Sequence, residues 1–333
     1  QQDQNMTSIV SDIIVNSDTE TGSKIIEELN NSTAEKDNDL SLQVISGISE
    51  KDTEKLNTLS ENNKEQIDTL TETAVKNAGS SQESADLIAQ VVANANDDFA
   101  NQIIGEVTKN SIDENQALSA KVMKSIVETT PDKVENLSDK NKETMITQTI
   151  EAAKNQAEGT STDEIDLSNT VAEIVSKSDL GTSTKVLETL NEVSGNSESK
   201  LSLNIFSNLT KQENYEEQIE INSVTSLRFE EGINKLSENA VSNALSEEDL
   251  QKVEDVLENS KGTVGDKIIN SANNNEENKK KIKEIIIKVV EKNPEKAVEI
   301  IERNKNTNTV LEVVKSKIEN KEAITTDDFE DVF

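Results

Sequence analysis

The chain of 333 residues contains no cysteine, no histidine and no tryptophan. Without cysteine there is no disulfide, no thiol nucleophile and no thiolate metal site. Without histidine, the commonest general base, the commonest zinc ligand and the Ser-His and Cys-His nucleophile pairs are excluded. We therefore expect a protein that is not an enzyme and that holds no cofactor and no metal ion.

Apolar residues are scarce as well. Hydrophobic residues make up 32% of the chain and aromatic residues only 2%, which is below the usual share in globular proteins and too little for a thick spherical core. No apolar run approaches the length that spans a bilayer, so we expect no membrane insertion. Two states remain: intrinsic disorder, or a thin fold in which each helix buries one narrow apolar stripe.

The spacing of the apolar residues favours a folded chain. They gather in pairs that recur at regular distances, whereas a disordered chain would scatter them without a period. Each pair has further apolar partners three or four residues away, which is the pattern of a helical stripe, and no sustained alternation indicates strands. The sequence therefore predicts an all-α protein. Clear examples of the recurring apolar pairs are Ile13-Ile14, Ile25-Ile26, Val91-Val92, Ile103-Ile104 and Val289-Val290.

The charge is strongly acidic, with 66 acidic residues against 34 basic ones and a net charge of −32. This field repels nucleic acid and anionic lipid, so neither is expected as a partner. A basic protein is the more natural companion. The alternative, which we favour, is that the charge only keeps a long and thin protein soluble.

Internal repetition organises the chain. "TEKLNTLSENNKE" from Thr53 aligns with "PDKVENLSDKNKE" from Pro131, and the apolar pairs of the two segments keep the same spacing of 78 positions. A third copy follows 83 positions later, with a diverged second half, and a fourth completes the array. Such periodicity indicates tandem structural units. The predicted boundaries are 1–83, 84–164, 165–247, 248–323 and a partial fifth unit at 324–333.

Each unit is predicted to form about four short helices separated by polar segments that carry helix-cap signals. Such helices, with one apolar face, are marginal alone and must pack on neighbours. Stacked units supply those neighbours, so we expect an α-solenoid of four tandem repeats of about 80 residues. It is similar to HEAT-like and armadillo-like proteins in general architecture only, because none of their signature residues maps onto this chain.

The last residues resemble the beginning of a further unit, since "FEDVF" from Phe329 aligns with "VEDVL" from Val253 at a spacing of 76. Three explanations compete: the chain is part of a longer polypeptide, the tail caps its own last unit, or the tail docks head to tail on the first unit of another copy. In the docking hypothesis the buried anchors are Phe329, Val332 and Phe333.

One loop resembles a calcium site. "NSDTETGSKIIE" places oxygen ligands at Asn16, Asp18 and Glu20 and a carboxylate at Glu27, the twelfth position, but Gly22 is seventh where a calcium loop needs glycine sixth. The corresponding segments of the other copies do not keep these ligands. The pattern therefore favours a helix-capping loop.

The remaining charged clusters have simple interpretations. Glycoside hydrolysis needs two carboxylates opposed across a cleft, one of them buried, whereas the acidic pairs here lie in polar segments and are predicted to be helix caps and solvated charge. A run of lysines is predicted to be a helix face that pairs with nearby glutamates, with an acidic partner as the alternative. These clusters are Asp97-Asp98, Glu247-Glu248-Asp249, Asp327-Asp328, and Lys279-Lys280-Lys281 with Lys283 and Lys288.

Two functions fit these observations. The first is a non-enzymatic structural protein: an extended acidic spacer, a cell-surface element or a filament subunit that contacts copies of itself head to tail. The alternative is a scaffold that holds a basic peptide or protein on an acidic concave face. The composition suits a secreted or cell-surface bacterial protein, and a cytoplasmic location is the alternative.

Overall fold

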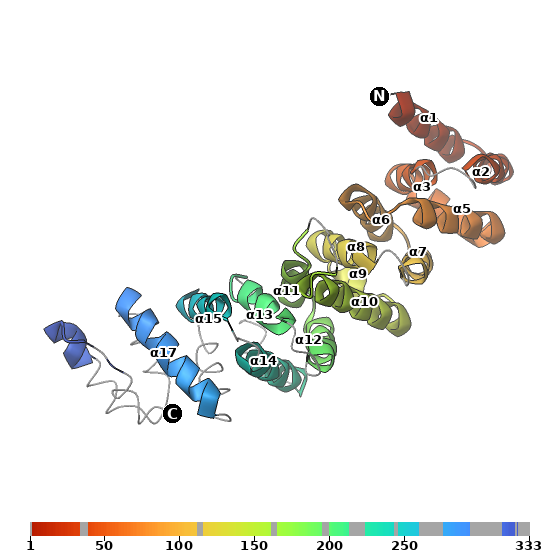
Figure 1. Ribbon diagram of the computed structural model, residues 1–333. Coiled ribbons are helices and arrows are strands. Elements are labelled where there is room, and N and C mark those ends of the chain that lie inside the picture. Colours follow the sequence, from red (N-terminus) through yellow and green to blue (C-terminus); the bar gives the residue numbers. More distant parts are fainter. Residues whose placement is uncertain are drawn as a thin grey trace. The chain divides into compact units, whose positions relative to one another are not determined.

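Every secondary-structure element that the structure describes is a helix, and no strand occurs among the described residues (Figure 1). This confirms the predicted all-α class. Within the same part of the chain, no helix is both long and apolar enough to cross a membrane. The structure is a computed structural model, and it describes residues 2–33, 39–111, 116–160, 165–194, 200–212, 224–242, 246–259, 276–293, 315–323 and 325.

The helices fall into two compact units, Gln1–Ala152 with Lys177–Thr182, and Ala153–Ser176 with Ser183–Phe333. In the first unit one row of helices runs α1, α3, α6, α8, each in contact with the next. A second row runs α2, α5, α7. The helices of the first row are α1 (Gln2–Asn16), α3 (Leu40–Lys51), α6 (Gln82–Asn94) and α8 (Gln116–Thr129), and those of the second are α2 (Thr19–Thr33), α5 (Lys64–Asn77) and α7 (Asp97–Asn110).

Residues 2–77 hold five described helices, where about four were expected. The extra break lies at Asp52, whose carboxylate accepts a hydrogen bond from the Lys55 amide at 2.8 Å and so begins a new helix. The short helix α4 (Thr53–Asn62) then leads into α5. The corresponding part of the next segment contains α9 (Asp132–Glu135), one turn long, followed by α10 (Asp139–Ala157).

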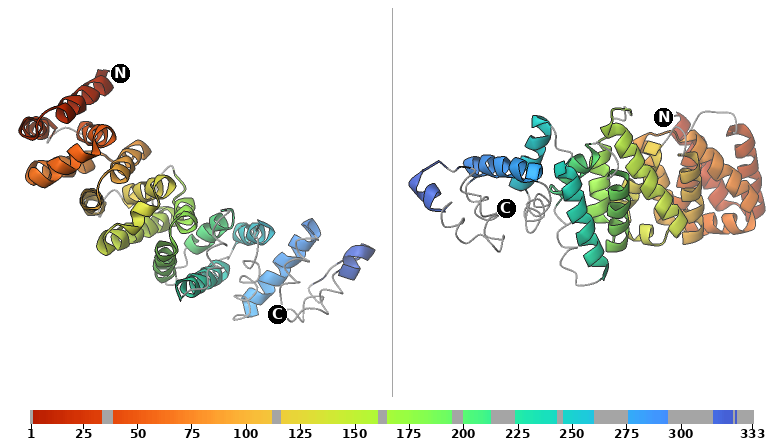
Figure 2. Two further views of the ribbon diagram at one scale, coloured as in Figure 1. Left: turned by 180° about the vertical axis from the view of Figure 1, so that it is seen from behind. Right: turned by 60° about the horizontal axis from the view of Figure 1, so that its bottom comes forward.

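The apolar pairs form the seams between these helices. Val91, Val92, Ile103 and Ile104 are all fully buried, as expected for stripes that face neighbouring helices. Two positions differ, because Ile25 is only partly buried and Ile13 of α1 is 50% exposed. For Ile13 the reason is position, because α1 lies at the end of its row and, among the described residues, has a neighbour in that row only on the α3 side (Figure 2).

Small residues allow α1 and α3 to approach closely. A Cβ atom added at Gly47 of α3 would lie 2.5 Å from the Ser11 Oγ of α1. That hydroxyl is fully buried and donates to the carbonyl oxygens of Thr7, at 2.9 Å, and Val44, at 3.3 Å. The contact fixes α1 firmly against α3.

The second unit contains most of α11 and α12, together with α13, α14, α15 and α17. Helix α13 contacts α14 and α15, and α15 contacts α17. The Asn191 side chain joins α12 to α14 by donating to the Gly232 carbonyl at 2.9 Å. The bounds are α11 (Leu167–Lys177), α12 (Leu180–Ser194), α13 (Leu201–Leu209), α14 (Val224–Ser242), α15 (Glu247–Asn259) and α17 (Glu276–Lys292).

Candidate functional site

The loop that resembles a calcium site is a helix cap. Asp18 Oδ1 accepts a hydrogen bond from the Thr21 amide at 2.8 Å, at the start of α2. The amide and hydroxyl of Thr21 stabilise the carboxylate and lower the pKa of Asp18. Within the described ranges, no group of three or more acidic side chains is placed to hold a metal ion. The geometry supports the helix-capping interpretation of this loop.

The same cap occurs at the two matching positions further along the chain. Asn96 Oδ1 accepts from the Phe99 amide at 2.9 Å, and Asp179 Oδ1 accepts from the Thr182 amide at 2.9 Å. Asn96 follows Asp18 by 78 positions and Asp179 follows Asn96 by 83, which are the spacings of the sequence repeat. A side chain three residues before its partner amide therefore begins the second helix of each of the first three predicted units.

Two further polar contacts recur at a spacing of 78, and neither was predicted from the sequence. The Lys55 ammonium donates to the Ser17 carbonyl at 2.5 Å, and Lys133 donates to the Ala95 carbonyl at 2.7 Å. Each lysine joins a short helix to the end of the first helix of its segment. The signal was present, because Lys55 and Lys133 are identical residues in the aligned segments.

The second recurring contact joins hydroxyl groups. Ser41 Oγ donates to Thr33 Oγ1 at 3.0 Å, and Ser119 Oγ lies 2.9 Å from Ser111 Oγ while it donates to Gln148 Oε1 at 2.6 Å. All four side chains are buried, so each pair satisfies groups that would otherwise be costly to remove from water. In both segments the pair joins the end of one helix to the start of the next.

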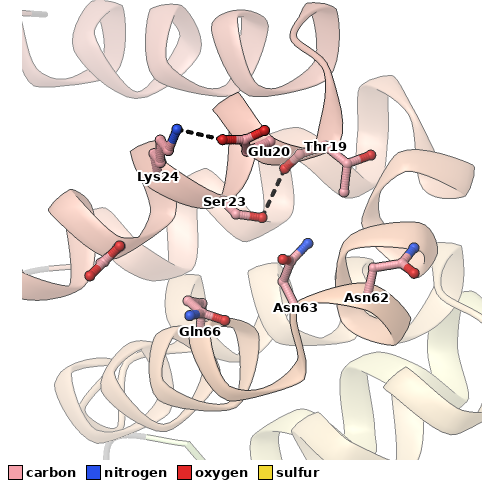
Figure 3. A pocket seen from close by; sticks show the side chains of 8 residues that line it. Thr19, Glu20, Ser23, Lys24, Asn62, Asn63 and Gln66 are labelled. Atoms are coloured by element: carbon pink, nitrogen blue, oxygen red, sulfur yellow. Dashed lines mark hydrogen bonds and ion pairs between the residues drawn. The ribbon is translucent and has the colours of Figure 1, made fainter.

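An open hollow of about 590 Å³ lies between α2 and the start of α5 (Figure 3). Its titratable side chains, Glu20, Lys24 and Glu27, are all exposed, and Glu20 and Lys24 form an ion pair at 2.7 Å. None of them has the burial that prepares a carboxyl or amine for catalysis. The other lining residues are Thr19, Ser23, Asn62, Asn63 and Gln66.

A contact that joins the two helices in the next segment is missing at this hollow. In the aligned segment 78 positions later, Asn141 Nδ2 donates to the Asn101 carbonyl at 2.8 Å and bridges the two helices. The matching residues are Asn63 and Ser23, and Asn63 Nδ2 has no hydrogen-bond partner among the described residues. The bridge between the two helices is therefore not repeated at the hollow.

The acidic pairs behave in two ways. Asp97 and Asp98 are exposed in the first turn of α7, where the helix dipole favours negative charge, as predicted. Asp249 was also expected to be solvated, and this expectation was wrong. Its side chain is only 1% exposed and forms an ion pair with Lys200 at 3.0 Å.

A capping box holds Asp249 in place. Ser246 precedes α15, and its hydroxyl accepts from the Asp249 amide at 3.2 Å while it donates to Asp249 Oδ2 at 2.6 Å. Burial disfavours the carboxylate, but the hydrogen bonds from Ser246 and the ion pair with Lys200 outweigh it and lower the pKa of Asp249. The same ion pair raises the pKa of Lys200.

We expect Asp249→Asn to destabilise the second unit by about 1–3 kcal/mol, because it removes a charged acceptor from a buried pair. The pKa of Asp249 is lower in the folded than in the unfolded protein. The stability that the Asp249 carboxylate contributes is therefore fully present above pH 3.8, its unfolded pKa, and is lost as the pH falls through the lower pKa of the folded state. The raised pKa of Lys200 means that it is present below pH 10.5 and is lost as the pH rises through the higher folded value.

Thermal unfolding of the unchanged chain and of Asp249→Asn across this pH range measures the difference in stability between them. The matched control is Glu248→Gln, one position earlier, whose side chain is 76% exposed and pairs with Lys252 at 3.7 Å. This exposed pair should contribute less than about 1 kcal/mol. Equal losses for the two variants would contradict the buried role of Asp249.

The lysine run lies in α17. Lys280 and Lys288 are exposed, and Lys292, at the end of the same helix, forms ion pairs with Glu254 and Glu258 of α15, the second at 3.6 Å. Pairing of the run itself with glutamates stays a prediction. Phe329, Val332 and Phe333, with the pair Asp327-Asp328, lie outside the described residues.

The polar groups described above all stabilise helices or the contacts between helices. They cap helices, join one helix to the next, or neutralise a buried charge at a helix start. These contacts therefore hold one helix against the next. No protein-family model matches this chain, and no curated protein matches its sequence.

Proposed function

We propose that this chain is a non-enzymatic structural protein, an acidic α-solenoid of four tandem units that serves as an extended spacer, a cell-surface element or a filament subunit. The observation that carries the proposal is the recurrence, 78 positions apart, of the lysine contacts of Lys55 and Lys133. The hydroxyl pairs and the helix caps recur with them. Such polar contacts depend on exact helix placement, so their repetition supports units that pack alike.

Stacking gives such a protein its mechanical role. Helix α3 of the first predicted unit packs against α6 of the second, and we expect each further unit to bury an apolar stripe against its neighbour in the same way. Stability then sums over the units and the seams between them, and the length grows with each unit added. The net charge of −32 keeps the surface hydrated and makes different molecules repel one another. These properties suit a spacer or surface element that works outside the cell.

Head-to-tail docking through Phe329, Val332 and Phe333 is the form of self-association that we propose for the filament role. Deleting residues 325–333 is expected to abolish any species larger than the monomer, because it removes the aromatic anchors. Light scattering on the intact and shortened chains measures the mass. An unchanged distribution of masses would exclude a docking role for the tail.

The acidic surface supports a second candidate, a scaffold for a basic peptide or protein. The two functions differ in solution. A spacer or filament subunit should be long or self-associated without any partner. A scaffold should be monomeric and should capture a cationic probe such as polylysine, with an affinity that falls steeply as salt is added.

A further inference from the structure

One side of α3 receives the next helix of its row. Leu42, Ser46 and Ser49 are four and three residues apart, which places them on one side of the helix, and all three are buried. Helix α3 packs against α6, and the Ser46 hydroxyl donates to Gln90 of α6 at 2.9 Å. We call this the outer side of α3, because α1 packs on α3 elsewhere, through the hydrogen bond from Ser11.

The outer side is also buried in the matching helices of the second and third predicted units. Five of the six corresponding residues are buried, and the sixth, Lys124, is partly buried. Helix α13 contacts α15 as α3 contacts α6. Small and apolar residues at these positions therefore go with a packed helix. They are Ala120, Lys124 and Val127 in α8, 78 positions after α3, and Leu203, Ser207 and Thr210 in α13, a further 83 positions on.

Helix α17 differs from these three helices on its outer side. In the predicted register its residues follow those of α8 by 164 positions, so that Ile282 and Ile286 match Leu118 and Val122. Ile282 and Ile286 are buried, as are their counterparts, and α17 contacts α15 (Figure 1). The outer side, by contrast, is charged and exposed. Its residues are Glu284, Lys288 and Glu291.

A helix that packed on this side would bury these three charges. Burial of charge is costly unless each group finds a partner. In water the same groups are well placed, because Lys280, Glu284 and Lys288 are exposed and alternate in sign at spacings of four residues, which is typical of a solvated helix face. The outer side of α17 is therefore suited to solvent and unsuited to a helix seam.

The last residues bear on this side through their register. "FEDVF" from Phe329 aligns with "VEDVL" from Val253, in α15. Helices α6 and α15 each pack on a helix of the α3 type. If the stacking continued, the segment from Phe329 would therefore take its place on the outer side of α17.

We propose that α17 is a capping helix, whose charged outer side ends the row of stacked helices. Stacked repeats need such a polar end to stay soluble. The proposal rests on the repeat register of the proposed function and adds the place where the row stops. Of the three explanations for the last residues, it excludes the one in which they pack on their own last unit.

Removing the charges tests what the outer side does. A triple variant that gives α17 the residues of α3 should self-associate at least about tenfold more strongly than the unchanged chain in sedimentation velocity, because the side then accepts a helix. The matched control makes the same changes in α2, where exposed Glu, Lys and Glu have the same spacing, and should leave the masses unchanged. Equal association of both variants, or of neither, overturns the cap. The substitutions are Glu284→Leu, Lys288→Ser and Glu291→Ser in α17, and Glu20→Leu, Lys24→Ser and Glu27→Ser in α2.

Thiol labelling of the full chain tests whether the side is covered, since the sequence has no cysteine. Lys288→Cys places one thiol on the outer side of α17. Ser46→Cys places one at the same repeat position of α3, where Ser46 is 3% exposed. We expect Lys288→Cys to react within about threefold of its rate in denaturant. Ser46→Cys should react at least about tenfold more slowly than in denaturant, because a buried thiol reacts only after local opening.

The outcomes separate the cap from the stacked units. Slow labelling of Lys288→Cys that becomes fast when residues 325–333 are deleted would mean that the tail covers α17, and it would overturn the proposal. Slow labelling that survives the deletion would overturn it as well, because another segment then covers this side. Fast labelling of both variants would contradict the seam between α3 and α6, and with it both the stacked units of the proposed function and the comparison that defines the cap.

Discussion

Phe99→Ala is expected to lower the free energy of unfolding by about 3–5 kcal/mol, because it removes a large buried side chain and leaves a cavity. Phe99 is 1% exposed in α7, beside the buried Ile103 and Ile104. Its backbone amide donates to the Asn96 cap, and the substitution keeps that hydrogen bond. The loss therefore reports the side chain alone.

Urea denaturation followed by helical circular dichroism measures this loss. Phe99→Leu is the matched control, since leucine refills most of the space and should cost only about 1 kcal/mol. A loss below about 1 kcal/mol for Phe99→Ala would mean that Phe99 is not a core residue. The packing of α7 against its neighbouring helices would then not depend on the Phe99 side chain.

Gly47→Val is expected to destabilise the first unit by about 1–3 kcal/mol through overpacking. A Cβ atom at Gly47 would lie 2.5 Å from Ser11 Oγ and 3.1 Å from Ser11 Cβ. The helices α1 and α3 would have to move apart, and the hydrogen bond from Ser11 to the Val44 carbonyl would be strained or lost. The variant thus tests whether the two helices pack as closely as described.

Gly105→Ala is the matched control for crowding. Gly105 also lies inside a helix, α7, but the nearest atom to an added Cβ would be 3.8 Å away. Because alanine is the better helix former, this change should stabilise the protein by about 1 kcal/mol. Thermal unfolding of the two variants should therefore shift in opposite directions. Shifts in the same direction would contradict the close approach at Gly47.

The helices and most of their buried sides could be predicted from the sequence, because helical periodicity is a local property. Val91-Val92 and Ile103-Ile104 show this, since both pairs are fully buried. The same pattern gave the wrong environment at Ile13, which is half exposed. Ile13 and Val91 occupy one position of the repeat, and only the presence of a neighbouring helix distinguishes them. That information is not local.

The charged positions were harder to place. Asp249 lies in "SEEDL", and its acidic neighbours suggested solvated charge, although Ser246 with Asp249 is the spacing of a capping box and could have been recognised. Its partner Lys200 is 49 positions away, and nothing in the sequence pairs them. The helix break at Asp52 was not predicted either. The apolar pattern continues across it, and the new helix is marked only by the hydrogen bond from the Lys55 amide to the Asp52 carboxylate.

Small-angle X-ray scattering of the full chain tests the central claim, that tandem helical units stack along one direction and share apolar seams. A globule of this length would have a radius of gyration of about 20 Å, and an unfolded chain about 65 Å. The account predicts a value clearly between these limits, a rod-like distance distribution and a strongly helical circular dichroism spectrum. A value near 20 Å with a globular distribution, or one near 65 Å without helical signal, would contradict it.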